Sequence, residues 1–192
     1  MAYLIDRIRD QLSKSGVKPG TREARQWLLS KSKNLNASKS SLMNDMARLR
    51  ENAMIGRMYF FFYDAKHKDK LPYFDRFPLV LPIEVYGDSF LGLNLHYIYP
   101  KHRLILLDKL SEFANNKNYD KTTKLRLSYD LLKRTSKVYE TNACLKKYLF
   151  SNIQSRFLEI SADEWDIAAL LPTENFSGSS TSRVHSNSRM KY

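Results

Sequence analysis

Apolar residues recur at helical spacing in the first third of the chain. This spacing predicts short helices over residues 2–12, from Thr21 to a polar loop at 30–41, and over 41–51. The apolar face of the first consists of Leu4, Ile5, Ile8 and Leu12. Helices this short are marginal on their own, so we expect them to pack on another element.

The hydrophobic period changes after Gly56, where residues 57–63 form an aromatic run. In an extended strand, Tyr59, Phe61 and Tyr63 would point to one side, and Met58, Phe60 and Phe62 to the other. A short aromatic run of this kind favours a strand that is buried on both faces. We therefore interpret these rings as core residues rather than as a platform for stacking bases, which needs exposed rings.

Two further strands are expected, over Leu79–Tyr86 and Ser89–Ile98, joined by a hairpin turn at Gly87 and Asp88. Pro82 inside the first of them indicates an edge position or a bulge, because proline lacks the amide donor of a sheet ladder. The three strands predict a small SH3-like barrel or a curled antiparallel sheet over residues 56–98, which needs helices around it for stability.

Helical patterns return in the last half of the chain. The predicted helices begin at Pro100, after Asp120, at about residue 142 and at the capping box Ser161–Glu164. The helix over 142–157 rests on the four-residue spacing of Leu145, Leu149, Ile153 and Phe157. The serine-rich segment 177–192 reads as a flexible tail.

These elements predict one α+β domain with basic terminal arms. Residues 1–55 are a basic helical region, residues 56–172 hold the small barrel and the helical core, and residues 173–192 are a C-terminal arm. The N-terminal helices are expected to belong to the same domain as the core.

The charge of the chain is unevenly distributed. The formal net charge is +12 over 192 residues, of which residues 1–58 carry +7, residues 59–172 carry +3 and residues 173–192 carry +2. Basic ends on a nearly neutral body suit nucleic-acid phosphates or the acidic faces of protein neighbours, although solubility alone is a third explanation. The candidate contacts to such partners are Arg22, Arg25, Lys31, Lys33, Lys39, Arg48, Arg50, Arg57, Arg183 and Arg189.

Motifs of enzymatic chemistry are missing from the sequence. It has no P-loop, no GxGxxG turn, no HExxH, no CxxC and no GxSxG. A hydrogen-bonded role is expected for His96, solvation for His67, and a buried apolar role for Cys144, while His102 and His185 pair with no other histidine at metal-ligand spacing. We expect no catalytic residue, no metal and no cofactor, and no run long enough to span a membrane.

A metal-dependent nuclease is the remote enzymatic alternative. Glu84 and Asp88 flank the predicted hairpin, and Lys66, Lys68 and Lys70 precede it, but their spacing matches no firm nuclease pattern.

Short motifs that extend over residues 55–176 carry a family resemblance. They are Met58–Phe60, Lys66–Lys68, Leu71–Asp75, Phe77–Leu79, Gly92–Tyr97, Cys144–Tyr148, Ser155–Phe157 and Glu164–Ala168. With them the chain resembles a small virion-associated protein of contractile-tailed phages of the T-even type. The structural signature that the resemblance implies consists of Tyr59, Pro72, Asp75, Pro78, Gly92, Asn94, His96, Tyr97 and Trp165.

The resemblance implies a non-enzymatic protein of the virion, present in the host cytoplasm during assembly. Its expected place is the head-to-tail neck or the tail machinery, where it would bind other virion proteins. The alternative is a protector of DNA ends or a non-specific binder of double-stranded DNA. No small-molecule substrate is expected in either case.

Overall fold

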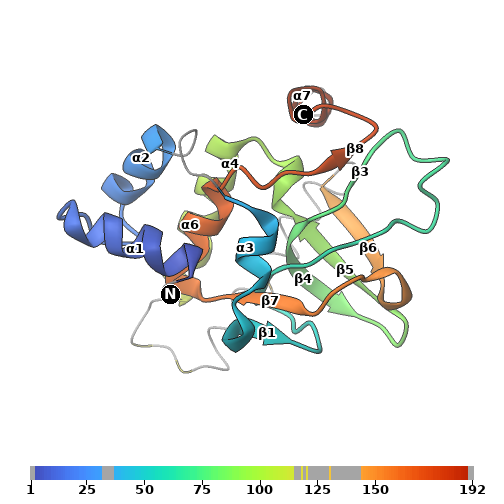
Figure 1. Ribbon diagram of the computed structural model, residues 1–192, viewed down its shortest axis with the longest axis horizontal. Helices are drawn as coiled ribbons and strands as arrows, with labels where there is room; N and C mark the ends of the chain where they lie inside the picture. The colour runs from blue at the N-terminus through green and yellow to red at the C-terminus, as the bar shows by residue number, and fades with distance from the viewer. Residues whose placement is uncertain are drawn as a thin grey trace.

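The computed structural model describes residues 3–31, 37–114, 118, 120, 130 and 144–189. A six-stranded antiparallel sheet with the order β1-β7-β2-β4-β5-β6 forms its centre (Figure 1). The strands are β1 (Leu49–Arg50), β2 (Met58–Phe60), β4 (Leu79–Val85), β5 (Ser89–Asn94), β6 (Leu145–Leu149) and β7 (Phe157–Ile160). A second sheet pairs β3 (Phe74–Asp75) with β8 (Phe176–Ser177).

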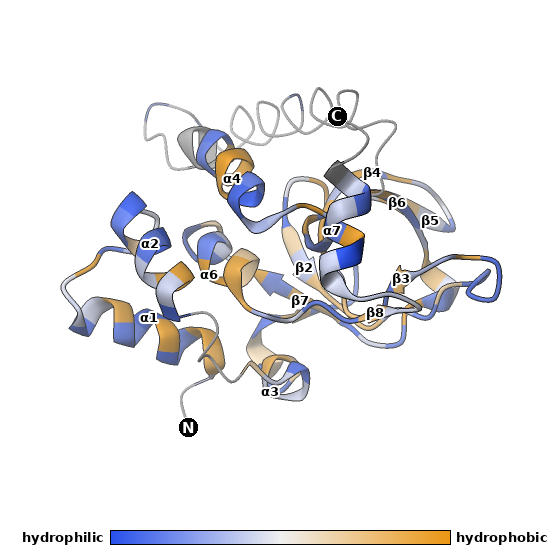
Figure 2. Ribbon diagram, turned by 90° about the horizontal axis from the view of Figure 1, so that it is seen from above, coloured by the Kyte–Doolittle hydropathy of each residue, from blue (hydrophilic) through white to orange (hydrophobic). Residues whose placement is uncertain are grey.

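Most helices gather beside one end of the large sheet (Figure 1). The helices are α1 (Leu4–Lys14), α2 (Arg22–Lys31), α3 (Lys39–Met43), α4 (Pro100–Ala114), α6 (Trp165–Leu170) and α7 (Thr181–Arg189), of which α7 lies apart from the others, near β8. The 3-10 turns are η2 (Met46–Arg48), η3 (Leu95–Tyr97), η4 (Phe150–Asn152) and η5 (Ala162–Glu164). Helix α6 contacts α1, α2 and α4, and all six of its residues are buried. Figure 2 shows that α6 is apolar along most of its length, as the centre of a helical layer must be.

The predicted N-terminal helices and the helix from Pro100 are confirmed, with the ends shifted by a few residues. Thr21 caps α2 as expected, because its Oγ1 accepts a hydrogen bond from the Ala24 amide at 3.2 Å.

The two-sided burial of the aromatic run is also confirmed, although the strand itself, β2, ends at Phe60. Met58 and Phe60 lie in the larger core cluster, and Phe62 packs against it, whereas Tyr59 and Phe61 lie in a second cluster on the other face. Phe60 and Phe61 are both fully buried, so their rings are core residues, as the sequence indicated.

The expected hairpin joins β4 to β5. The Tyr86 amide donates to the Ser89 carbonyl at 2.8 Å, and the strand register shifts between Pro82 and Glu84, which is the bulge that the proline predicted. Gly92 pairs with Pro82, and a Cβ at that position would overlap Val80 Cγ1.

Several sequence-based expectations were wrong. Of the two alternatives for the sheet, the structure shows an open antiparallel sheet that extends beyond residues 56–98, because β1, β6 and β7 join it. The third predicted strand ends at Asn94 and continues as η3. The third predicted helix is shorter, and the residues after it form η2 and β1.

The predicted helix over 142–157 is two strands, β6 and β7, joined through η4. The error has a simple cause, since apolar residues four apart fit a strand of period two as well as a helix of period 3.6. Cys144 therefore precedes a strand instead of lying in a helix, and it is buried as expected. Of the helix expected after Asp120, the structure describes only Asp130, which is helical, and the rest lies outside the described residues.

The C-terminal segment is not a plain flexible tail. Residues 181–189 form α7, and Val184 of this helix is fully buried against the core. The serine-rich composition hides this docking helix, because few of its side chains are apolar.

Candidate nucleic-acid interface

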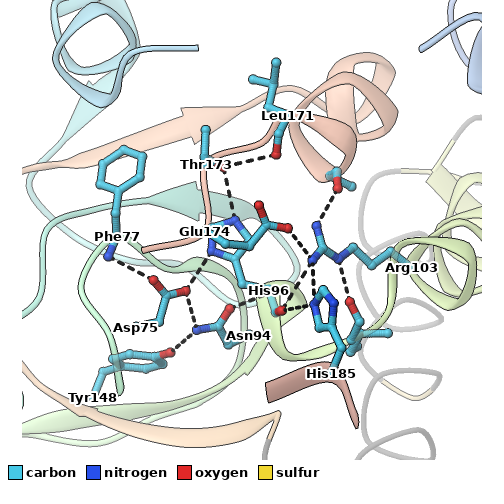
Figure 3. A network of polar contacts seen from close by, with 12 residues as sticks. Asp75, Phe77, Asn94, His96, Arg103, Tyr148, Leu171, Thr173, Glu174 and His185 are labelled. Atoms are coloured by element: carbon cyan, nitrogen blue, oxygen red, sulfur yellow. Dashed lines mark hydrogen bonds and ion pairs between the residues drawn. The ribbon is translucent and has the colours of Figure 1, made fainter. Parts of the chain in front are cut away.

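A buried polar network is centred on the carboxylate of Asp75, the last residue of β3 (Figure 3). Asp75 Oδ2 accepts hydrogen bonds from His96 Nδ1 at 2.7 Å and from Asn94 Nδ2 at 3.1 Å, and Oδ1 accepts from the Phe77 amide at 3.1 Å. Asn94 Nδ2 also donates to the Tyr148 hydroxyl at 3.0 Å. These contacts compensate for the burial of a carboxylate, which is costly when it is unpaired.

The network continues from His96 to the C-terminal helix. His96 Nε2 lies 3.2 Å from Thr173 Oγ1, and the His96 carbonyl accepts from His185 Nε2 at 2.9 Å. His96 and Thr173 are almost completely buried, so this arrangement has the chemistry of a structural hydrogen-bonded pair. The expectation of a hydrogen-bonded role for His96 is confirmed.

Arg103 joins η3, α6 and α7 at the same place (Figure 3). Its side chain is 1% exposed and donates to the carbonyls of Ile98 at 2.7 Å and Ala169 at 2.8 Å, and to Glu174 Oε1 at 2.6 Å. Burial lowers the pKa of His185, and the charge of Arg103 lowers it further. The neutral imidazole of His185 is therefore the form that suits α7 in its docked position.

An open pocket of about 310 Å³ adjoins this network, because Asp75 and Tyr148 belong to both. Asp75, Tyr97 and Tyr148 belong to its lining and are almost completely buried, and half-buried Tyr63 and Tyr73 line it as well. The rings lie in contact pairs, with centroids 4.9 Å apart for Tyr63 and Tyr148 and 6.0 Å apart for Tyr73 and Tyr97. The walls of the pocket are therefore aromatic, and the hydrogen bond from Asn94 to Tyr148 holds one of the rings in place.

Basic residues line the same pocket. Lys146 and Lys147 lie on β6, an edge strand of the six-stranded sheet, and Lys66 and His67 come from the exposed loop after Tyr63. Lys146 Nζ lies 4.7 Å from the centroid of the Tyr97 ring. A lysine on an edge strand also discourages pairing with another sheet, but this position over an aromatic wall suits an anionic aromatic ligand.

A second observation places Lys66 and Lys147 in one electrostatic environment. The hydrogen bond from Ser89 lowers the pKa of Asp88, and the charges of Lys147 and Lys66 lower it further. Asp88 lies in the exposed β4–β5 turn, while Asp75 is the only carboxylate among the described residues that line the pocket. The rim therefore carries a surplus of positive charge.

The arginines expected to contact a partner are partly used inside the fold. Arg25 is buried and pairs with Asp166 at 2.9 Å and with Asp108. Arg50 and Arg57 are exposed but both pair with Glu159, Arg50 at 2.8 Å.

Arg48 holds the most extensive of these clusters. It pairs with Glu164, with Asp45 at 2.8 Å and with Asp6 at 2.9 Å, and Glu164 also pairs with Arg9 at 3.1 Å. These contacts link η2, η5 and α1, and the hydrogen bond that Arg48 donates to Glu164 raises the pKa of Arg48.

The other expected contacts are spread over the surface. Arg22 and Lys31 are exposed on α2, Lys39 is half-buried at the start of α3, and Arg183 is exposed on α7. Arg189 is the last residue of α7, and Lys33 lies outside the described residues. None of Arg22, Lys31, Lys39 and Arg183 lines the lysine-tyrosine pocket, the pocket formed by Lys66, Lys146, Lys147 and the tyrosines.

The residues of the expected structural signature occupy three places. The network and the pocket contain four of them, Asp75, Asn94, His96 and Tyr97. Pro72 follows the loop 64–71, which we call the pocket loop, and lies close to Gly178. The remainder are core residues: Tyr59, Pro78, Gly92 and Trp165, whose Nε1 donates to the Ile160 carbonyl at 3.1 Å.

The residues raised for other chemistry do not gather into one site. Glu84 and Asp88 are both exposed. Lys68 pairs with Asp64 at 2.9 Å, and both lie in the pocket loop, as does Lys70. His102 is exposed on α4. Among the described residues, no group of three or more His, Cys, Asp or Glu side chains is placed to hold a metal ion. Within the same residues, no helix is long and apolar enough to cross a bilayer.

Sequence reasoning did not single out Tyr63, Tyr73, Lys146 and Lys147, which line the pocket. The sequence pattern predicts Tyr63 as part of the aromatic strand and both lysines as part of the helix over 142–157, and Tyr73 appears only within the motif Leu71–Asp75. The available signal was Lys146 alternating with Tyr148 on an extended strand, which places both on one face.

Comparison with known families shows to which protein family the chain belongs. The family described as phage T4 terminal DNA protecting protein matches residues 4–191. The chain belongs to this family of terminal DNA protecting proteins. The resemblance to T-even-type phage proteins is thereby confirmed, and the DNA-protecting member of the alternatives is favoured. No curated protein and no solved structure matches this terminal DNA protecting family member significantly.

Proposed function

We propose that the protein binds the ends of linear double-stranded phage DNA and shields them from exonucleases. The observation that carries the proposal is the family match over residues 4–191, because the family is described by protection of terminal DNA. This function replaces the neck or tail role that the sequence favoured first. It requires no catalytic group, since an end is protected when it is covered.

The charge of the protein supports the same function. A net charge of +12 draws the chain toward DNA, and phosphate contacts give binding that weakens steeply with salt. Arg25 and Arg48 are paired within the fold, so the phosphate contacts are assigned to exposed cations, among them Lys66 and Lys147. The protein acts within the virion or in the infected cell, at the ends of the packaged genome.

The test is a protection assay with linear duplex DNA and a processive exonuclease. We expect full-length DNA to survive when protein is added at a few molecules per DNA end. Binding of a labelled linear duplex should be competed well by linear DNA and poorly by closed circular DNA of the same sequence.

The competitors separate end protection from its alternatives. Equal competition by circular DNA, with protection only when protein coats the whole duplex, would mean non-specific DNA binding. No binding at low salt would exclude both DNA functions and leave the basic surface to acidic virion proteins.

A further inference from the structure

The lysine-tyrosine pocket combines the two features needed to hold one nucleotide. Its walls are tyrosine rings, and its rim carries Lys66, Lys146 and Lys147. Base stacking on aromatic side chains and phosphate contacts to lysine together hold unpaired nucleic acid in many proteins. The volume of about 310 Å³ is at the lower end of the range for small-ligand pockets and has no room for a duplex.

The pocket favours a nucleotide at an end over one inside a duplex. Inside a helix, each base has two stacked neighbours, and extracting it costs a few kcal/mol. A terminal base has only one stacked neighbour, and an overhanging base has no pairing partner, so both leave the stack more easily. A pocket that takes one unstacked base therefore recognises an end without reading its sequence.

The charges inside the pocket agree with this occupant. The only carboxylate among the described lining residues, Asp75, already accepts three hydrogen bonds from His96, Asn94 and the Phe77 amide. Asp75 is buried, whereas Lys66 and Lys147 are exposed and Lys146 is half-buried, so an anionic backbone meets cations first.

We infer that this pocket receives the terminal nucleotide of a DNA strand, with the base against the half-buried ring of Tyr73 and its phosphate at Lys146 and Lys66. The inference rests on the proposed end-binding function and names the place where the end is held. It also explains why a tyrosine-lined pocket adjoins a basic edge strand.

The experiment measures the affinity for duplexes that differ only in their last nucleotide. One duplex ends in a normal unpaired nucleotide, and the other ends in an abasic one, which keeps the phosphate and removes the base. Wild-type protein should bind the abasic end roughly five- to 150-fold more weakly, the range expected for one stacked base.

Tyr73→Ala should lose a similar factor with the normal end and nothing more with the abasic end, whereas Tyr73→Phe should bind like the wild type. Lys66→Ala and Lys146→Ala should each flatten the slope of log affinity against log salt by about 0.9 for a lost phosphate contact. Lys14→Ala removes the same charge on exposed α1, at the opposite end of the molecule from β6 (Figure 1), and is the matched control. Thermal unfolding confirms that each variant is folded.

The outcomes distinguish the two proposals. If wild-type protein prefers ends but is indifferent to the abasic nucleotide, and Tyr73→Ala binds normally, the pocket is not the site, although end protection stands. If wild-type protein shows no preference for ends, the proposed function fails and the pocket inference fails with it.

Discussion

We expect Arg48→Ala to lower the free energy of unfolding by about 2–3 kcal/mol and to leave the DNA affinity of the folded protein unchanged. Arg48 pairs with Glu164, whose side chain is 1% exposed, and with Asp45 and Asp6. The substitution leaves a buried carboxylate without its main partner.

The magnitude follows from the geometry. Removal of one partner from a buried ion pair costs about 3–5 kcal/mol. Arg48 keeps 18% of its side chain exposed, and Arg9 still lies 3.1 Å from Glu164, so we take a value somewhat below that range. With a urea m-value of about 2 kcal/mol/M, the midpoint of unfolding should fall by about 1–1.5 M.

Urea unfolding followed by circular dichroism measures the effect. Arg22→Ala, which removes an exposed arginine from α2, is the control and should stay within about 0.5 kcal/mol of wild type. In the double variant with Glu164→Gln, the two losses should be less than additive, because the residues share one contact. The reasoning is refuted if Arg48→Ala unfolds like the wild type while its DNA affinity drops.

Three further predictions concern the core. Gly92→Ala should destabilise the protein by about 1–3 kcal/mol through overlap with Val80, and Val80→Ala in the same chain should recover part of the loss; thermal unfolding checks both. Burial and the charge of Arg103 lower the pKa of His185 in the folded protein. Below about pH 6.5, His185 is therefore protonated more fully in the unfolded chain than in the folded one, so the free energy of unfolding should fall as the pH drops through that value. His185→Gln should flatten this dependence in urea titrations between pH 5 and 8, and an unchanged slope would contradict it. Burial raises the pKa of Cys144 to about 11, so iodoacetamide should label this thiol slowly at pH 8 in the folded protein and rapidly in urea; fast labelling of folded protein would argue against its burial.

Local patterns predicted the parts of the fold whose signals are short-range. The alternation from Met58 to Phe62 predicted the two faces of the aromatic run, and Pro82 predicted an edge position or a bulge, of which the structure has the bulge. Strand geometry and proline chemistry act over a few residues. The strands around Tyr148 and Phe157 were missed because four-residue spacing satisfies both a helix and a strand.

The candidate site depends on contacts that no local pattern contains. Asp75 and His96 were named as a structural signature, but their hydrogen bond joins residues 21 positions apart. Tyr73 reaches the pocket through its contact with Tyr97 after β5, and Lys146 reaches it through the pairing of β6 with β5. Likewise, the sequence shows the charge of Arg48 but not Glu164 beside it, so an internal ion pair was read as a basic surface.

Asp75 and Tyr148 belong both to the buried network and to the pocket wall, so folding itself fixes the inner side of the pocket. These side chains have little rotamer freedom left to lose when a ligand arrives. The exposed lysine stems on the outer side still have theirs. The pocket therefore has a rigid interior that discriminates by shape and a mobile edge that attracts by charge, and ionic strength acts on the edge alone.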